Sequence, residues 1–163
     1  MASLTAWKFD TPDGADQALK KVQDLSKQQL IQIEDAATVS WPKGKKKPKT
    51  HQAHSMAGVG ALSGAFWGML FGLLFFIPFL GMAMGAAVGA LAGHFTDYGI
   101  SDDFIKQVRE KVTEGTSALF LLTEQATVDK VADAFKGTKM ELIQSNLSTE
   151  QEKKLREAFG EEE

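Results

Sequence analysis

GVGALSGAFWGMLFG (residues 58–72) and GMAMGAAVGALAG (residues 81–93) are the most apolar segments of this chain, and glycine recurs in both at every fourth position. Glycine inside a water-exposed helix costs about 0.8–1 kcal/mol relative to alanine, so this spacing needs a compensating role. A stripe of glycines lets a second helix backbone approach closely. The pattern therefore predicts helices that pack and oligomerise through their glycine faces. The repeating glycines are Gly60, Gly64, Gly68, Gly72, Gly81, Gly85, Gly89 and Gly93.

The middle of the chain carries no formal charge. Asp, Glu, Lys and Arg are absent between Lys49 and Asp97, although they make up 24% of the 163 residues. One membrane crossing needs about 20 apolar residues, so this stretch has the length for two crossings. Pro78 marks the turn between them, because proline is tolerated at a helix start but not in a helix interior. We expect a helical hairpin in the bilayer, with helices at about residues 57–76 and 79–96.

A run of lysines precedes this apolar stretch and predicts its orientation. Positive charge beside a membrane helix favours the cytoplasmic side, and each lysine close to anionic lipid headgroups contributes about 1 kcal/mol. The start of the chain, MASLTAWKFDTPDG, lacks the pattern of a secretory signal. We therefore expect a protein of the bacterial inner membrane, with cytoplasmic termini. The lysines expected to contact headgroups are Lys43, Lys45, Lys46, Lys47 and Lys49.

Strand patterns flank the apolar stretch on both sides. In SLTAWKFD (residues 3–10), alternation places Leu4 and Ala6 on one side of a strand. Trp7 and Phe9 face the other side. By the same pattern, further strands are expected over about residues 30–41, 117–124 (SALFLLTE) and 139–145 (KMELIQS).

Capping residues predict where the helices begin. Thr11 is expected to cap a helix after the first strand, and Thr127 a helix after SALFLLTE. Ser101 is expected to cap SDDFIKQVREKV (residues 101–112). Ser148 and Gln151 have the spacing of a capping box, which predicts a final helix from Ser148.

The order strand, helix, strand occurs once before the apolar stretch and once after it. This order predicts an α+β fold of the ferredoxin-like, split βαβ type, with four antiparallel strands and two helices on one face of the sheet. The expected organisation is a first half with its lysine-rich hairpin (1–50), an inserted hydrophobic helical hairpin (55–97), and the inserted helix, second half and C-terminal helix (98–163).

Several blocks of the sequence together resemble a known family. They are TPDGADQAL, IEDAATV, the whole glycine-rich stretch, DYGISDDFIKQV, GTSALFLL and NLSTEQEKKL. In this order they resemble, nearly end to end, an uncharacterised family of bacterial membrane proteins known only as a domain of unknown function. The resemblance implies a glycine-zipper hairpin inserted in a ferredoxin-like domain. It implies no activity and no ligand residues.

The sequence offers little for catalysis or ligand chemistry. The chain has no cysteine, which excludes disulfides, thiolate metal sites and cysteine nucleophiles. His51, His54 and His94 lack a carboxylate or cysteine at helical spacing, so interfacial polar residues are a better interpretation than a metal site. Asp35 and Asp97 suit turn or helix-end positions better than acid–base roles. No nucleophile–base pair or phosphate-loop pattern is present, so we expect no enzyme, no cofactor and no metal.

We therefore expect a non-enzymatic, homo-oligomeric membrane protein with a scaffold or stress-related role. Its expected partners are further copies of itself and membrane lipid, and nucleic acid is not expected because the chain is net acidic, at −3. Two alternatives remain open. The oligomer encloses a pore, or the hairpins are buried inside a soluble assembly of many copies.

Overall fold

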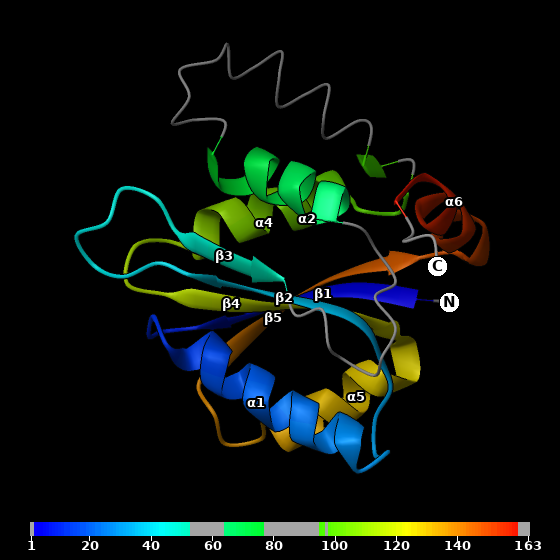
Figure 1. Cartoon of the computed structure of the whole chain (residues 1–163), viewed down its shortest axis with the longest axis horizontal. Helices are drawn as coiled ribbons and strands as arrows, with labels where there is room; N and C mark the ends of the chain where they lie inside the picture. The colour runs from blue at the N-terminus through cyan, green and yellow to red at the C-terminus, as the bar shows by residue number, and fades with distance from the viewer. Residues whose placement is uncertain (1, 53–63, 77–94, 97, 160–163) are drawn as a thin grey trace.

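The computed structural model describes residues 2–52, 64–76, 95–96 and 98–159 (Figure 1). Within these residues the fold is α+β, with five antiparallel strands in one sheet and five α-helices. The predicted class is therefore confirmed, but the predicted number of strands, four, is wrong. The elements are β1 (Ala2–Phe9), α1 (Gly14–Lys27), β2 (Ile33–Ser40), β3 (Lys49–Gln52), α2 (Gly64–Phe71), the π-helical segment η2 (Gly72–Phe76), α4 (Asp102–Lys111), β4 (Ser117–Glu124), α5 (Gln125–Ala134), β5 (Met140–Leu147) and α6 (Thr149–Phe159).

The strands of the described sheet follow the order β3-β2-β4-β1-β5. β1 lies between two strands from the second half of the chain, so Leu4 is opposite Leu122 of β4 and Ser145 of β5. The added strand is β3, which pairs with β2 from Ala37 to Ser40. The sequence prediction missed β3 because its residues, KTHQ, show no apolar alternation.

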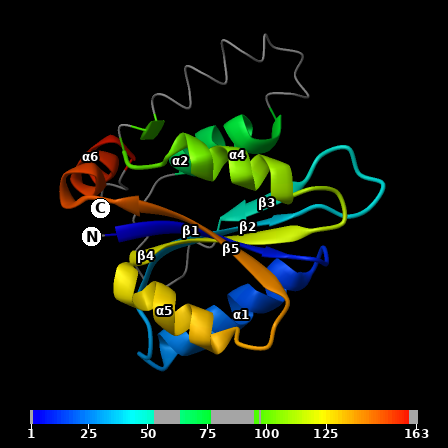
Figure 2. The ribbon, with the colours of Figure 1, turned by 180° about the vertical axis from the view of Figure 1, so that it is seen from behind.

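Helices cover both faces of the sheet. Figures 1 and 2 show α1 and α5 on one face and α2 and α4 on the other. The alternation predicted for β1 is confirmed, because Leu4 and Ala6 pack in the core between the sheet and helices α2 and α4. Trp7 and Phe9 pack in the second core, between the sheet and helices α1 and α5.

The described part of the apolar stretch, residues 64–76, packs on the sheet. Phe66, Leu70 and Leu73 are fully buried in the same core as Phe120 of β4. The predicted α-helix over 57–76 ends at Phe71 and continues as the π-helical η2. Within the described residues, no helix combines the length and the apolar character needed to cross a bilayer. The other parts of the predicted hairpin, 57–63 and 79–94, lie outside the described residues.

Two of the predicted caps are confirmed. Ser101 Oγ accepts a hydrogen bond from the backbone N–H of Phe104, at 3.2 Å, and α4 begins at the next residue. At α6 the backbone N–H of Ser148 donates to Gln151 Oε1 at 2.9 Å, while the N–H of Gln151 donates to Ser148 Oγ at 3.2 Å. Both bonds of a capping box are thus formed.

The other two predicted caps are wrong. α1 begins at Gly14 with Asp13 as its N-cap, and Thr11 lies before it, where its carbonyl accepts bonds from the N–H of Gly14 and from Ser117 Oγ. α5 begins directly after β4, so Thr127 is buried inside its first turn.

Candidate functional site

The outer side of α2 and η2 is the part of the predicted glycine stripe that the structure describes. Gly68 is exposed and Gly72 is half-buried. A Cβ built on either glycine meets no heavy atom of the described chain within 4 Å. We call Gly68 and Gly72 the glycine face. Gly64 begins α2, and the remaining predicted glycines, Gly60, Gly81, Gly85, Gly89 and Gly93, lie outside the described residues.

A buried hydrogen bond fixes α2 on the opposite side. Trp67 Nε1–H donates to Asp35 Oδ2 of β2 at 2.9 Å, and the two residues are 2% and 1% exposed. The other carboxylate oxygen of Asp35 accepts from the backbone N–H of Ala36 at 2.8 Å. A buried hydrogen bond is costly to break, because the group that loses its partner has no water to bond to. Asp35 therefore serves as a structural acceptor that holds α2 on the sheet.

Aromatic rings complete this attachment. The Trp67 ring centroid lies 5.0 Å from that of Phe66 and 6.4 Å from that of Phe120, in edge-to-face arrangements. Phe71 also meets Phe120 edge-on, at 5.3 Å. Such pairs contribute about 0.5–1.5 kcal/mol each beyond the area they bury. Because these rings point at the sheet, the glycine face is turned away from it.

Four of the predicted lysines lie in the loop between β2 and β3, which projects from one end of the sheet (Figure 1), and Lys49 begins β3. All five, Lys43, Lys45, Lys46, Lys47 and Lys49, are exposed. Trp41 Nε1–H donates to the Lys45 carbonyl at 2.9 Å, and Gly44 turns the chain at a φ of +84°. The hairpin thus concentrates positive charge on one exposed loop, where anions and anionic surfaces have access to it.

Three carboxylates gather at the other end of the sheet. Oxygen atoms of Glu34, Glu124 and Glu152 lie within 4.8 Å of one another. No local sequence pattern predicts this group, because β2, β4 and α6 bring its members together from distant positions. All three residues have other interactions in the chain, so they are not a set of free metal ligands. His51 is exposed on β3, while His54, His94 and Asp97 lie outside the described residues.

Comparison with known proteins gives one match. A family model described as "Protein of unknown function (DUF1269)" matches residues 61–160. The matched region runs from the first glycine segment through α2, α4, β4, α5 and β5 to the end of α6. No curated protein and no solved structure matches the chain.

Proposed function

The chain belongs to the DUF1269 family of proteins of unknown function, and we propose that it is a non-enzymatic scaffold whose copies assemble through the glycine face. The observation that carries this proposal is the two-sided character of α2 and η2. Their large apolar side chains are buried against the sheet, while Gly68 and Gly72 point away from it. Asp35, the one candidate acid–base residue described, is engaged by Trp67 and Ala36.

The composition of α2 indicates that its outer side contacts another protein surface and not water. A helix that faces water normally carries charged or polar side chains there, whereas α2, GAFWGMLF, has none. Glycine exposes the helix backbone, which allows a second backbone to pack closely through dispersion and weak Cα–H···O contacts. A second copy of the same segment presents the same glycines, and self-packing therefore suits this surface.

We place the assembly at the bacterial inner membrane. The support is the chargeless stretch from residue 50 to residue 96 and the five exposed lysines of the β2–β3 hairpin. Anionic headgroups attract such a cluster. A soluble assembly of many copies is the second candidate. The burial of most large apolar side chains of residues 66–75 on their own sheet favours it, because these side chains then need no lipid to cover them.

Alkaline carbonate washing separates these two candidates. We expect the protein to stay with the membrane pellet, because its apolar stretch holds it there. Release of intact oligomers into the supernatant would contradict the membrane location and would support the soluble assembly. A cytoplasmic marker and an integral membrane marker in the same fractions serve as controls.

We also propose the finer description of the fold, a ferredoxin-like domain with an insertion. The strand order without β3 is β2-β4-β1-β5, and α1 and α5 lie on one face. This is the arrangement expected of a split βαβ unit. In this description, β3, α2, η2 and α4 are additions that cover the second face.

Replacing Gly68 by leucine is expected to weaken self-association by about tenfold or more, because the new side chain fills the space where a second backbone would pack. The fold of one copy should survive, since no described atom lies within 4 Å of a Cβ at Gly68. Size-exclusion chromatography with light scattering measures the change.

Gln107→Leu is the matched control, because it adds the same side chain at an exposed position of the neighbouring α4. We expect this variant to assemble like the wild type. If the Gly68→Leu variant also keeps its wild-type mass across a dilution series, the glycine face is not the contact between copies.

A further inference from the structure

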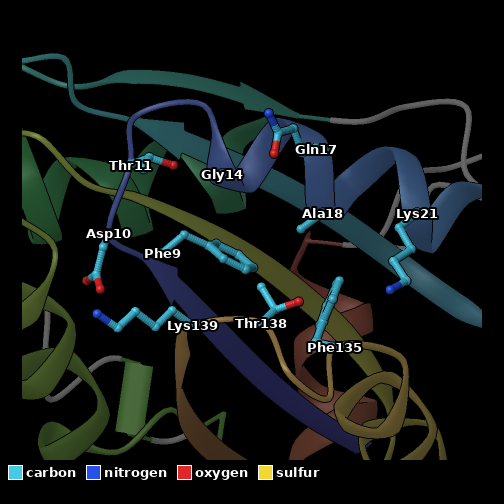
Figure 3. Close-up of a pocket in the computed structure, with 10 residues that line it drawn as sticks. All are labelled: Phe9, Asp10, Thr11, Gly14, Gln17, Ala18, Lys21, Phe135, Thr138 and Lys139. Atoms are coloured by element: carbon cyan, nitrogen blue, oxygen red, sulfur yellow. The ribbon is translucent and has the colours of Figure 1, made fainter.

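A cleft lies on the sheet face opposite the glycine face, between the start of α1 and the segment that follows α5. Its volume is about 390 Å³, which is within the range of small-molecule sites, roughly 300–1,000 Å³. Figure 3 shows side chains from both segments around it. The lining residues include Phe9, Ala18, Lys21, Phe135, Thr138 and Lys139.

The floor of the cleft is apolar and rigid. Phe9 and Phe135 are only 4% and 2% exposed, and their ring centroids lie 5.9 Å apart in an edge-to-face pair. The facing residues of α1 are small, namely Gly14 and Ala18. A Cβ on Gly14 would lie 2.6 Å from Phe9 Cβ, so only glycine lets α1 begin this close to β1. Because these residues are small, the cleft between α1 and the segment after α5 stays open beside the buried rings.

Positive charge borders this floor. Lys21 Nζ lies 5.6 Å from the Phe135 ring centroid and donates a hydrogen bond to the Ala134 carbonyl, which fixes the ammonium group beside the cleft. Lys139 borders the other side of the two rings (Figure 3). An ammonium group has three donors, so Lys21 keeps donors for a ligand.

Asp10, the acidic residue at the rim of the cleft, does not cancel the positive charges of Lys21 and Lys139. Asp10 Oδ1 pairs with Lys8 Nζ at 2.8 Å. The hydrogen bond from Lys8 and its charge, with a smaller contribution from Lys139, hold the pKa of Asp10 below its ordinary value. The charged residues that line the cleft are Asp10, Lys21 and Lys139, so the lining carries a net positive charge, and Lys8 beside it offsets the charge of Asp10.

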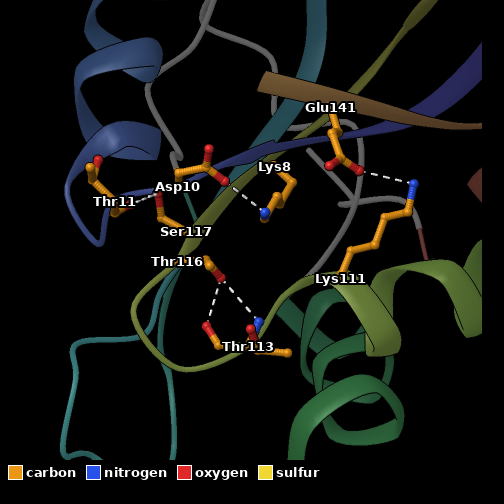
Figure 4. Close-up of polar contacts among 8 residues, drawn as sticks. All are labelled: Lys8, Asp10, Thr11, Lys111, Thr113, Thr116, Ser117 and Glu141. Atoms are coloured by element: carbon orange, nitrogen blue, oxygen red, sulfur yellow. Dashed lines mark hydrogen bonds and ion pairs between the residues drawn. The ribbon is translucent and has the colours of Figure 1, made fainter. Parts of the chain in front are cut away.

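The backbone at the rim is held in place by Ser117 of β4. Its Oγ donates to the Thr11 carbonyl at 2.7 Å, a contact drawn in Figure 4, and accepts from the backbone N–H of Ala15 at 2.8 Å. These two bonds tie the turn between β1 and α1 to the sheet. The cleft is therefore formed before any ligand arrives, which lowers the entropic cost of binding.

We propose that this cleft binds a small carboxylate or phosphate that is attached to a flat apolar group. The flat group lies in the cleft between α1 and the segment after α5, against Ala18 and the small exposed part of the Phe9 and Phe135 rings. The anion accepts a hydrogen bond from Lys21, while Lys139 adds a second positive charge and Thr138 a hydroxyl group. This activity is separate from self-assembly, because the glycine face lies on the other side of the sheet.

Titration of the full-length protein with phenyl phosphate tests the proposal, with backbone amide NMR shifts or calorimetry as the measurement. We expect saturable binding of phenyl phosphate. Benzoate in a parallel titration shows which anion the cleft prefers. Inorganic phosphate and phenol each carry only half of the proposed ligand, so both should bind at least about tenfold more weakly.

Two variants locate the site. Ala18→Leu should abolish binding by filling the cleft that Ala18 lines, and Lys21→Met should weaken it about tenfold or more by removing the ammonium group. Lys20→Met makes the same change of charge at the neighbouring exposed position of α1, which does not line the cleft, and should bind within about twofold of the wild type. The proposal is overturned if neither phenyl phosphate nor benzoate binds at millimolar concentration, or if Lys21→Met binds as tightly as Lys20→Met.

Discussion

Trp67→Ala should abolish most of the stability of the fold. The substitution removes a side chain that is 2% exposed, and emptying such a site costs about 3–5 kcal/mol. It also takes the indole N–H away from the buried carboxylate of Asp35, which adds about 1–3 kcal/mol. Because small domains are stable by only about 5–15 kcal/mol, we expect a large fall in the urea midpoint. The urea midpoint is measured by circular dichroism on the purified wild-type and variant proteins under the same conditions.

Trp67→Phe separates the two contributions. Phenylalanine keeps most of the packing against Phe66 and Phe120 but has no N–H, so we expect a loss of about 1–3 kcal/mol. Trp41→Phe is the control, since the Trp41 indole also donates a hydrogen bond but is only half-buried. Wild-type midpoints for both Trp67 variants would mean that α2 does not pack on the sheet.

Gly99→Ala should have the second largest effect. Gly99 has a φ of +91°, and its added Cβ would lie 2.8 Å from Gln151 Oε1 and 3.1 Å from Leu147 Cα. The left-handed conformation costs alanine about 1–2 kcal/mol, and the crowding adds about 1–3 kcal/mol. Displacing the Gln151 amide also disturbs the capping box of α6. The free energy of unfolding should therefore fall by about 2–5 kcal/mol.

Gly137→Ala is the matched control for the backbone. Gly137 has nearly the same φ, +88°, but a Cβ there meets no described atom within 4 Å. The Gly137→Ala variant should lose only the free energy that alanine pays for the left-handed backbone conformation, about 1–2 kcal/mol. Equal losses in Gly99→Ala and Gly137→Ala, measured by urea denaturation, would show that the α6 end does not pack closely against Gly99.

Local signals in the sequence predicted the local features of this fold. The alternation of Leu4, Ala6, Trp7 and Phe9 assigned both faces of β1 correctly, because neighbouring side chains in a strand point to opposite sides. The capping box at Ser148 depends on groups three residues apart and was equally visible. Such features need no knowledge of the rest of the molecule.

Features that depend on distant partners were not predictable in this way. β3 is polar and forms because the edge of β2 is open to it. The apolar composition of residues 64–76 does not by itself distinguish burial on a sheet from burial in a bilayer, because both call for similar apolar residues. The bond from Trp67 to Asp35 joins residues 32 positions apart. The cleft likewise combines residues 9–21 with residues 135–139.

The position of β1 between β4 and β5 has a consequence for how the chain acquires its structure during synthesis. Both neighbours of β1 are made more than a hundred residues later, since Leu4 is opposite Leu122 and Ser145. At about 5–20 residues per second, the first strand waits on the order of ten seconds at the ribosome for a partner. The apolar segment 64–76 is also made before β4, on which it packs. A chain with such long-range pairing folds slowly, and until β4 emerges its apolar parts depend on chaperones or on another surface for cover.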